Sequence, residues 1–457
     1  MNAEQRFDWP VCHEAEDYLL EAMDGFLSRH TFARELTRRM RDETGTLLMD
    51  WTDHLVLGYA AADDLRRLGF VPDTAAEAPS GQQAWHHAEA MLPRVILDPA
   101  SGSRLDTLAI HVESIVEFLA VHEITTPIDG EPMSRYRRAL VGLEDETRFF
   151  VVERRGYRGY IPAASDAASA LKLMKASELW QTRRRCYDDP ASGFADSLAL
   201  IDQLIEMIGR DLTCHVVFDG ERRFWQRRNR AARIQKSRQD RLGLGWANHD
   251  HHTFRSSREG FVPLMAVMEK LGFERRERYY AGEQAGWGAQ IMEQPVEGIV
   301  VFCDLDLLPE DVKTDFSRQP LPPSRKLGTV GLWVGLHGES FLDAGMHHLE
   351  CRFDHALLRE QLAAEGIGTM KPFSDFPFLK QAFTEGERWQ VRPERAKRLL
   401  DEGRIDEAQY RTFLADGAIG SHLENLQRKG GFKGFNQQSV SAIIAATDPR
   451  LQAGQGH

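Results

Sequence analysis

Two short segments of the sequence place a histidine four residues before an arginine. The first runs from His249 to Arg255 as HDHHTFR, and the second, MHHLECR, contains His348 and Arg352. Both segments are typical of β-strands, in which residues two and four positions apart face the same side of a sheet. We therefore expect His251 to share a face with Arg255, and His348 to share a face with Arg352.

This combination of imidazole and guanidinium groups predicts metal chemistry on an acidic substrate. Two converging imidazoles bind Fe, Zn, Cu or Ni, and together with one carboxylate they form the open ligand set of non-haem Fe(II) oxygenases. The arginines would repel a metal cation unless an anion lies between them. A substrate carboxylate fits this role because arginine binds it through two parallel hydrogen bonds. The sequence thus predicts a divalent metal on His251 and His348, with Arg255 and Arg352 near the substrate.

Each of these residues also has a purely structural interpretation. A strand histidine such as His251 can be satisfied by a neighbouring backbone group, and Arg255 and Arg352 can be ordinary ion-pair partners. The recurrence of the pattern in both segments favours the metal-ligand interpretation. His249, expected on the His251 face, is a candidate for the rim of the site. Glu350, on the second strand, is a candidate carboxylate.

The elements that would position these residues form an internal repeat. HDHHTFRSSREGFVPLMAVMEKLGF and MHHLECRFDHALLREQLAAEGIG share a histidine-containing strand, an arginine and an amphipathic helix that ends at glycine. Three strand-like runs follow the first copy, and TEGERWQV is the clearest later strand of the second. We predict an α+β fold in which two βαβββ modules pair through their first strands and form one cupped sheet around the metal.

The remainder of the chain is expected to form two further regions. Residues 1–100 are predicted to be mostly helical, residues 101–245 to be mixed α/β with a basic helix at the end, and residues 246–447 to be the metal-binding catalytic domain with a helical C-terminal segment. The segment LAIHVESIVEFL, which contains His111, has the strand-helix order of a further, degenerate module. A helical cap with this histidine in its core is the alternative that we favour.

Composition excludes several classes of protein. A chain of 457 residues with 42% hydrophobic and 28% charged residues is globular and long enough for two or three units. Its net charge of −12 disfavours general nucleic-acid binding, and no apolar run approaches the ~18 residues of a membrane span. Five scattered cysteines without a CxxC pair, and an acidic N-terminus unlike a secretory signal, predict a cytoplasmic protein. The basic run 222–241 indicates a solvated helix paired with carboxylates, or a surface for an anionic partner.

The same motifs resemble a known family. DHHTFR (250–255) is similar to the D-H-x-x-F-R element of the 2-oxoadipate dioxygenase/decarboxylase family, a branch of the vicinal-oxygen-chelate superfamily. HHLECR (347–352) resembles its N-H-[LV]-T-x-R element, although His347 and Glu350 stand where that family has Asn and Thr. FTEGER (383–388) resembles its aromatic-x-Glu segment, and QSVSAII (438–444) its C-terminal Val-Ser segment. The resemblance covers residues 246–447.

The resemblance implies a set of site residues. Its metal ligands would be His251, His348 and Glu385, with Glu387, Glu339 or Glu350 as the alternatives to Glu385 because the second module is compact. Arg255 would bind the substrate carboxylate as the catalytic arginine, and Val440 and Ser441 would line the substrate pocket.

The resemblance also implies an activity. The protein would be an Fe(II)-dependent dioxygenase that decarboxylates a 2-oxo acid similar to 2-oxoadipate and gives a hydroxy acid and CO2, with the 2-oxo acid and O2 as its partners. Another divalent transition metal is an alternative to Fe(II). Two other functions remain open: a metal-dependent lyase or isomerase of the glyoxalase type that needs no oxygen, and a non-catalytic binding protein without metal.

Overall fold

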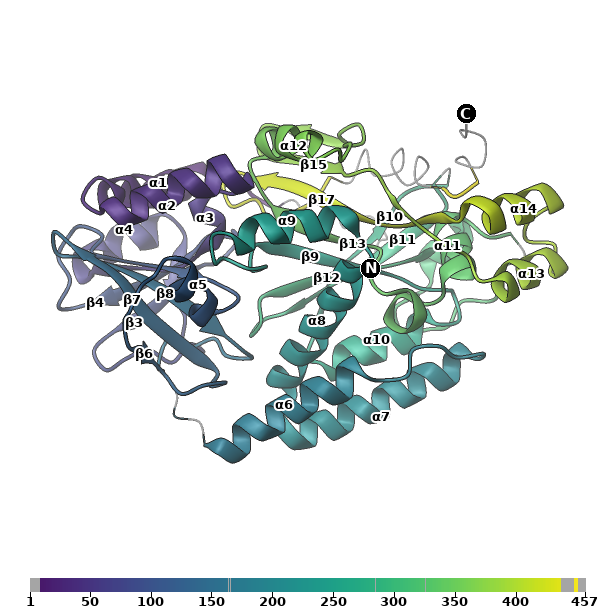
Figure 1. The fold of residues 1–457 in the computed structure, drawn as a ribbon, viewed down its shortest axis with the longest axis horizontal. Coiled ribbons are helices and arrows are strands. Elements are labelled where there is room, and N and C mark those ends of the chain that lie inside the picture. The colour runs from purple at the N-terminus through teal and green to yellow at the C-terminus, as the bar shows by residue number, and fades with distance from the viewer. Residues whose placement is uncertain are drawn as a thin grey trace.

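The computed structural model describes residues 9–162, 164, 166–283, 285–324, 326–436 and 448–450. Figure 1 shows two β-sheets, one in the purple and blue part of the chain and one in the teal, green and yellow part, each flanked by helices. Among these residues, no helix has the length and hydropathy required to cross a membrane.

The first sheet, called the N-terminal sheet, has eight strands in the order β2-β3-β4-β1-β5-β8-β7-β6. Its strands are β1 (Thr52–Gly58), β2 (Phe70–Pro72), β3 (Gln83–His87), β4 (Arg94–Asp98), β5 (Thr107–His111), β6 (Ile128–Asp129), β7 (Tyr136–Glu144) and β8 (Thr147–Arg154). Helix α4 (Ala62–Arg67) follows β1, and α5 (Ile115–Val121) follows β5. Strands β1 and β5 pair antiparallel at the centre, while β4 and β8 run parallel to them on either side. The sheet therefore consists of two βαβββ modules joined through their first strands.

The second sheet, called the C-terminal sheet, repeats this arrangement in the order β10-β11-β12-β9-β13-β17-β15-β14, with β16 paired to β17. Its strands are β9 (His249–Arg255), β10 (Glu274–Tyr280), β11 (Trp287–Gln294), β12 (Ile299–Asp306), β13 (His348–Arg352), β14 (Ser374–Phe376), β15 (Leu379–Phe383), β16 (Glu387–Trp389) and β17 (Ala418–Arg428). Helix α10 (Phe261–Lys270) follows β9, and α12 (His355–Ala364) follows β13. The predicted α+β class and the paired modules are confirmed, and β9 pairs antiparallel with β13.

The other helices surround and connect the two sheets. They are α1 (His13–Leu27), α2 (Thr31–Thr44), α3 (Leu48–Trp51), α6 (Ala167–Gln181), α7 (Pro190–Ile208), α8 (Arg210–Arg227), α9 (Arg230–Asp240), α11 (Thr329–His337), α13 (Pro393–Asp401) and α14 (Glu407–Asp416), with the short turns η1 (Tyr59–Ala61), η2 (Pro309–Lys313) and η3 (Ser340–Ala344). Local sequence explains their ends. The Asp189 side chain accepts hydrogen bonds at the start of α7, where proline occupies the first turn, and α2 stops at Gly45 with φ of 66°.

One face of each sheet packs against helices. Phe26 and Leu36 of α1 and α2 belong to the same core as Leu55 of β1, and Trp180 of α6 to the same core as Phe254 of β9. Because side chains alternate along a strand, these contacts leave the opposite face of each central strand for other residues. In β9 that opposite face carries His251, which is how the fold positions the site described below.

Two regions differ from the sequence-based expectation. Residues 52–98, expected to be mostly helical, contain β1 to β4, and the N-terminal sheet spans the boundary expected near residue 100. His111 ends β5 and lies in a module, not in a helical cap. Residues 418–428, part of the C-terminal segment 393–447 that was expected to be helical, form β17. β1 and β17 are buried along most of their lengths, so they lack the polar-apolar alternation by which a half-exposed strand is recognised.

Candidate metal centre

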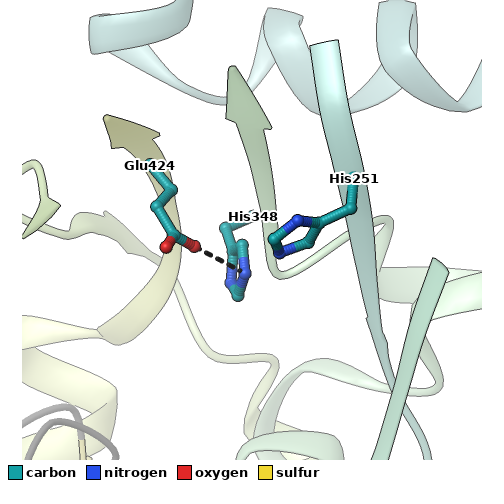
Figure 2. Close-up of side chains that lie close together, drawn as sticks. All are labelled: His251, His348 and Glu424. Carbon is teal, nitrogen blue, oxygen red and sulfur yellow. Dashed lines mark ion pairs between the residues drawn. The ribbon is translucent and has the colours of Figure 1, made fainter. Parts of the chain in front are cut away.

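Three adjacent strands of the C-terminal sheet bring His251, His348 and Glu424 together (Figure 2). The ligand atoms of these residues lie within 4.8 Å of one another. The imidazole rings of His251 and His348 are 6.2 Å apart between their centroids. All three side chains are buried. The predicted convergence of the two histidines is therefore present, and the neighbouring carboxylate comes from β17.

The orientation of His251 is fixed by Asp250. His251 Nδ1 lies 3.1 Å from Asp250 Oδ1, and the Asp250 carboxylate accepts two hydrogen bonds from Arg428, at 2.9 and 2.8 Å. A β-bulge at this point of β9 breaks the regular alternation, and such a bulge re-aims the affected side chain. With Nδ1 donating to Asp250, Nε2 is the ring atom left to bind a metal, and it lies 2.5 Å from Glu350 Oε2.

His348 has its own set of partners. Its Nε2 atom lies 3.1 Å from Glu424 Oε2 and 2.8 Å from the Thr253 hydroxyl, while its Nδ1 atom is 2.9 Å from Nδ1 of His347. Burial, with His251 nearby, holds the pKa of His348 well below its ordinary value, so the ring is neutral. Burial opposes the charging of His251 as well, but the carboxylates of Glu350 and Asp250 raise its pKa overall. A neutral imidazole is the form that binds metal.

Two buried glutamates face each other beside these histidines. Glu350 and Glu424 are partners in the parallel pairing of β13 and β17, and Gln381 Nε2 lies 3.1 Å from Glu424 Oε1 and 3.4 Å from Glu350 Oε1. Burial and the like charge of Glu350 raise the pKa of Glu424 well above its ordinary value. Two adjacent buried carboxylates cannot both ionise cheaply without a cation. This donor set therefore fits a divalent metal ion, which would offset the repulsion.

Aromatic side chains cover the two histidines. The ring of Phe302 lies 4.3 Å from that of His251, and the ring of Phe383 lies 5.0 Å from that of His348, both measured between centroids. Phe435 packs edge-on against Phe302 at 5.2 Å. These apolar surfaces restrict the access of water to the metal-binding atoms.

Arg255 lies further along β9 and is almost completely buried, with 1% of its surface exposed. Its guanidinium lies over the Trp333 ring at 5.7 Å, and its Nε and Nη1 atoms have no hydrogen-bond partner among the described residues. Burial lowers the pKa of Arg255 to about 10, although Asp304 and Asp306 favour its charged form. Its charge also contributes to lowering the pKa of His348. A buried cation with unused donors near the histidines is suited to binding an anion.

Of the four predicted carboxylates, the structure brings only Glu350 to the histidines, where it lies beside His251 in a second possible metal-binding group with Asp250. Glu385 is exposed in the segment after β15, where its backbone N–H donates to Gly368. Glu387 accepts a hydrogen bond from the Arg230 N–H, and Glu339 accepts from Ser256 and Ser257. The reason is topological: β17 is inserted between β13 and β15, so the carboxylate beside His348 is that of Glu424.

Two further predicted residues lie elsewhere. The Arg352 side chain points to a cavity between the two sheets, with Nε 3.9 Å from Asp250, and does not join Arg255. His249 lines the same cavity because the bulge at Asp250 turns it away from His251. Val440 and Ser441 lie outside the described residues.

Glu424 was missed because its segment was expected to be helical. A signal was nevertheless present in the sequence: the tripeptide His-Leu-Glu occurs at 348–350 and again at 422–424. In the structure these two tripeptides pair residue by residue in β13 and β17. The internal match would have predicted two neighbouring strands with their glutamates side by side.

Comparison with known proteins gives only distant likenesses. No protein-family model and no curated protein matches the sequence. Among solved structures, a mutant of 4-hydroxymandelate synthase from Streptomyces coelicolor is 11% identical over 88% of this chain and 98% of that chain, with a TM-score of 0.29. Methylmalonyl-CoA epimerase from Mycobacterium tuberculosis is 11% identical over 40% and 88%, with a TM-score of 0.23, and a glyoxalase I mutant from Zea mays is 8% identical over 56% and 69%, with a TM-score of 0.19. Values this low are no basis for assigning a function, so the fold assignment rests on strand order and register.

Proposed function

We propose that this protein is an Fe(II)-dependent oxygenase that decarboxylates a 2-oxo carboxylic acid, with His251, His348 and Glu424 as metal ligands. The observation that carries the proposal is that two imidazoles and one carboxylate converge on adjacent buried strands. Their ligand atoms lie within 4.8 Å of one another. Two histidines and one carboxylate form the ligand set of non-haem Fe(II) oxygenases. The overall reaction would combine the 2-oxo acid with O2 to give CO2 and a hydroxy acid one carbon shorter.

The bound metal would polarise the 2-oxo group and activate oxygen. The chain supplies the remaining functions. Asp250 contacts Nδ1 of His251, which leaves Nε2 for the metal once Glu350 has moved away, and Arg428 keeps Asp250 ionised through two hydrogen bonds. For His348, the contact with His347 fixes the ring on its other side. These contacts hold the two histidine rings in place, whereas Glu350 would have to move away from His251 Nε2 when the metal binds.

Arg255 is the proposed substrate-binding residue. The Nε and Nη1 atoms of its buried side chain have no hydrogen-bond partner among the described residues. Arg255 lies on the same strand as His251. A carboxylate of the substrate would satisfy these donors and neutralise the charge. The aromatic rings of Phe302 and Phe383 would exclude water around the reacting group, which strengthens the pairing.

A second function is favoured by one observation, the proximity of Glu350 to His251 Nε2 at 2.5 Å. If Glu350 is a fourth protein ligand, the site has two histidines and two glutamates and fewer positions for small molecules. Such a site suits a metal-dependent lyase or isomerase that needs no oxygen. Under the first proposal, Glu350 is instead displaced from the metal and accepts a hydrogen bond from Gln381.

Metal analysis followed by oxygen uptake distinguishes these functions. The purified protein should retain about one equivalent of iron per chain, and oxygen consumption should depend on an added 2-oxo acid and yield one CO2 for each O2. Turnover of a 2-oxo acid without oxygen uptake would support the lyase or isomerase. The absence of iron, zinc and nickel after reconstitution would contradict both and leave a binding protein.

A further inference from the structure

A cavity of about 1110 Å³ lies between the N-terminal and C-terminal sheets. Residues of both sheets and of helices α3 and α8 line it. Its walls combine apolar side chains, such as Met91, Met133 and Leu173, with many charged ones. The volume is sufficient for a small organic molecule.

Most cations that line this cavity are already neutralised. Six of them form ion pairs with carboxylates at 2.5 to 2.9 Å: Arg154, Arg155, Arg158, Arg223, Lys236 and Lys433. Arg94 lies 4.0 Å from Asp73 and donates to a backbone carbonyl. These residues have partners within the protein and leave little capacity for a ligand.

Two lining arginines lack such a partner. Arg222 forms no ion pair with a carboxylate of the described residues, and its Nη1 atom is 3.3 Å from the ring Nε2 of His252. Arg352 forms one long ion pair among the described residues, with Asp250 at 3.9 Å, and both oxygens of that carboxylate are already bonded to Arg428. The Nε atom of Arg352 has no hydrogen-bond partner in the described part of the chain. Arg222 and Arg352 are therefore the two cations of this lining without a close ion pair among the described residues, although carboxylates such as Asp50 and Glu297 line the same cavity.

The two arginines approach the same part of the wall. His249 pairs with Cys351, the residue before Arg352, in the register of β9 and β13. The ring of His249 lies 5.5 Å from that of His252, to which Arg222 is bonded. Three residues before His249, the indole N–H of Trp246 lines the cavity, is buried, and has no partner among the described residues. Two cations and an unused N–H donor thus lie around one imidazole.

We propose that this cavity is a second ligand site, separate from the metal centre, which binds a small organic molecule through a carboxylate or phosphate group held by Arg222 and Arg352. Both oxyanions accept the paired hydrogen bonds that guanidinium groups offer. The apolar part of the wall would contact the body of the ligand. The proposal does not depend on the reaction catalysed at the metal.

Calorimetric titration of the metal-loaded protein with succinate and with inorganic phosphate tests this site. We expect one equivalent of at least one of the two anions to bind, and the anion that binds more tightly identifies the chemical group. Arg222→Gln should raise the Kd of this anion by at least about tenfold, since one charge-assisted contact is lost. Arg223→Gln is the matched control, because the adjacent Arg223 also lines the cavity but is paired with Asp219 at 2.8 Å, and it should leave Kd within about twofold.

Two additional variants keep the result unambiguous. His348→Ala, which removes a proposed metal ligand, should retain the anion and so exclude binding at the metal. Arg352→Gln should reproduce the loss seen with Arg222→Gln, and it replaces that variant if circular dichroism shows that Arg222→Gln is unfolded. Failure of both anions to bind, or an unchanged Kd in the folded arginine variants, would overturn the proposal and identify the cavity as a solvent-filled crevice.

Discussion

The N-terminal and C-terminal sheets share one constellation of side chains. In each, an Asp-His pair lies on the first strand of the first module, Asp53-His54 in β1 and Asp250-His251 in β9, at a β-bulge in the pairing with the next module. In each, the histidine Nδ1 contacts the aspartate, at 2.5 and 3.1 Å, and an arginine of the last strand makes two hydrogen bonds to that aspartate. Those arginines are Arg154 of β8 and Arg428 of β17.

The sheets differ at the other positions of the site. The register makes Thr107 of β5 equivalent to His348, and Phe150 of β8 equivalent to Glu424. Ala109 stands where the C-terminal sheet has Glu350. Consequently only the C-terminal sheet groups two histidines with a carboxylate in the described residues, although His54 is buried like His251.

This difference distinguishes the residues that stabilise the fold, which both sheets have, from the proposed metal ligands, which only the C-terminal sheet has. The Asp-His-Arg constellation occurs in both sheets, although only the C-terminal sheet also has the second histidine and the glutamate. We therefore infer that the constellation stabilises the junction of two modules in each sheet. The proposed metal binding would depend on the second histidine and the last-strand glutamate. In the N-terminal sheet, the corresponding region is a cavity of about 210 Å³ lined by His54, Thr107, Phe150 and two tyrosines.

The largest expected difference between the sheets is in metal content. His348→Ala should reduce bound metal from about one equivalent to nearly none, because only one imidazole and one carboxylate remain near the ion. His54→Ala, the matched change in the N-terminal sheet, should leave the metal content unchanged. Elemental analysis of protein shown to be folded by circular dichroism measures both. Equal metal content in the two variants would remove the proposed distinction.

The next largest effect is expected from Arg255→Lys. Lysine keeps the positive charge but loses the planar pair of donors, so kcat/KM for the best 2-oxo acid should fall by at least about 100-fold. Bound metal should be unaffected. Arg148→Lys, on β8 of the other sheet, is the control and should change kcat/KM by less than about twofold. If Arg255→Lys has equally little effect, Arg255 has a structural role and the lyase or isomerase function gains support.

Matched substitutions of the shared aspartates should separate affinity from stability. Asp250→Asn should weaken metal affinity by about 10- to 100-fold, since it removes the acceptor that orients His251. Asp53→Asn should not alter metal affinity. Both should lower the free energy of unfolding, by about 3 kcal/mol, because a buried arginine loses its charged partner. Metal titration and urea unfolding test the pair, and a metal defect in Asp53→Asn would contradict the comparison.

A double substitution in the N-terminal sheet would reconstruct the difference between the sheets most directly. Thr107→His together with Phe150→Glu should give the N-terminal sheet the same three ligand types beside His54. Bound metal should then rise from about one to about two equivalents, whereas each single substitution should add none. If the folded double variant still binds one equivalent, features other than the ligand residues define the site.

Much of the C-terminal sheet could be predicted from the sequence. The repeated strand-helix pattern predicted the paired modules, and alternation predicted that His251 and Arg255 share a face of β9. The strand that contains His348 and the helix after it were likewise predicted from local pattern. These features are local, since they depend on the spacing of residues within one element.

The failures involved information that is not local. Glu424 lies on a strand whose burial on both faces removes alternation, and its insertion between β13 and β15 decides which carboxylate reaches His348. The bulge at Asp250 displaced His249 from the expected face. β1 was misinterpreted for the same reason as β17, and with it the whole N-terminal sheet. Strand order and bulges arise from tertiary pairing, which a single sequence does not display.

The antiparallel pairing of β9 with β13 has a consequence for folding. With His251 on β9, and His348 and Glu424 on β13 and β17, neither module contains all three proposed ligands, so an intermediate with one module formed could not retain the ion. Metal capture would then report that both halves of the sheet have docked. A ligand that binds only the native state stabilises it by about 4 kcal/mol at a free concentration 1,000 times its Kd. The ion would act as a removable cross-link, and chelation would loosen the junction of the two modules before it affected either helix-covered core.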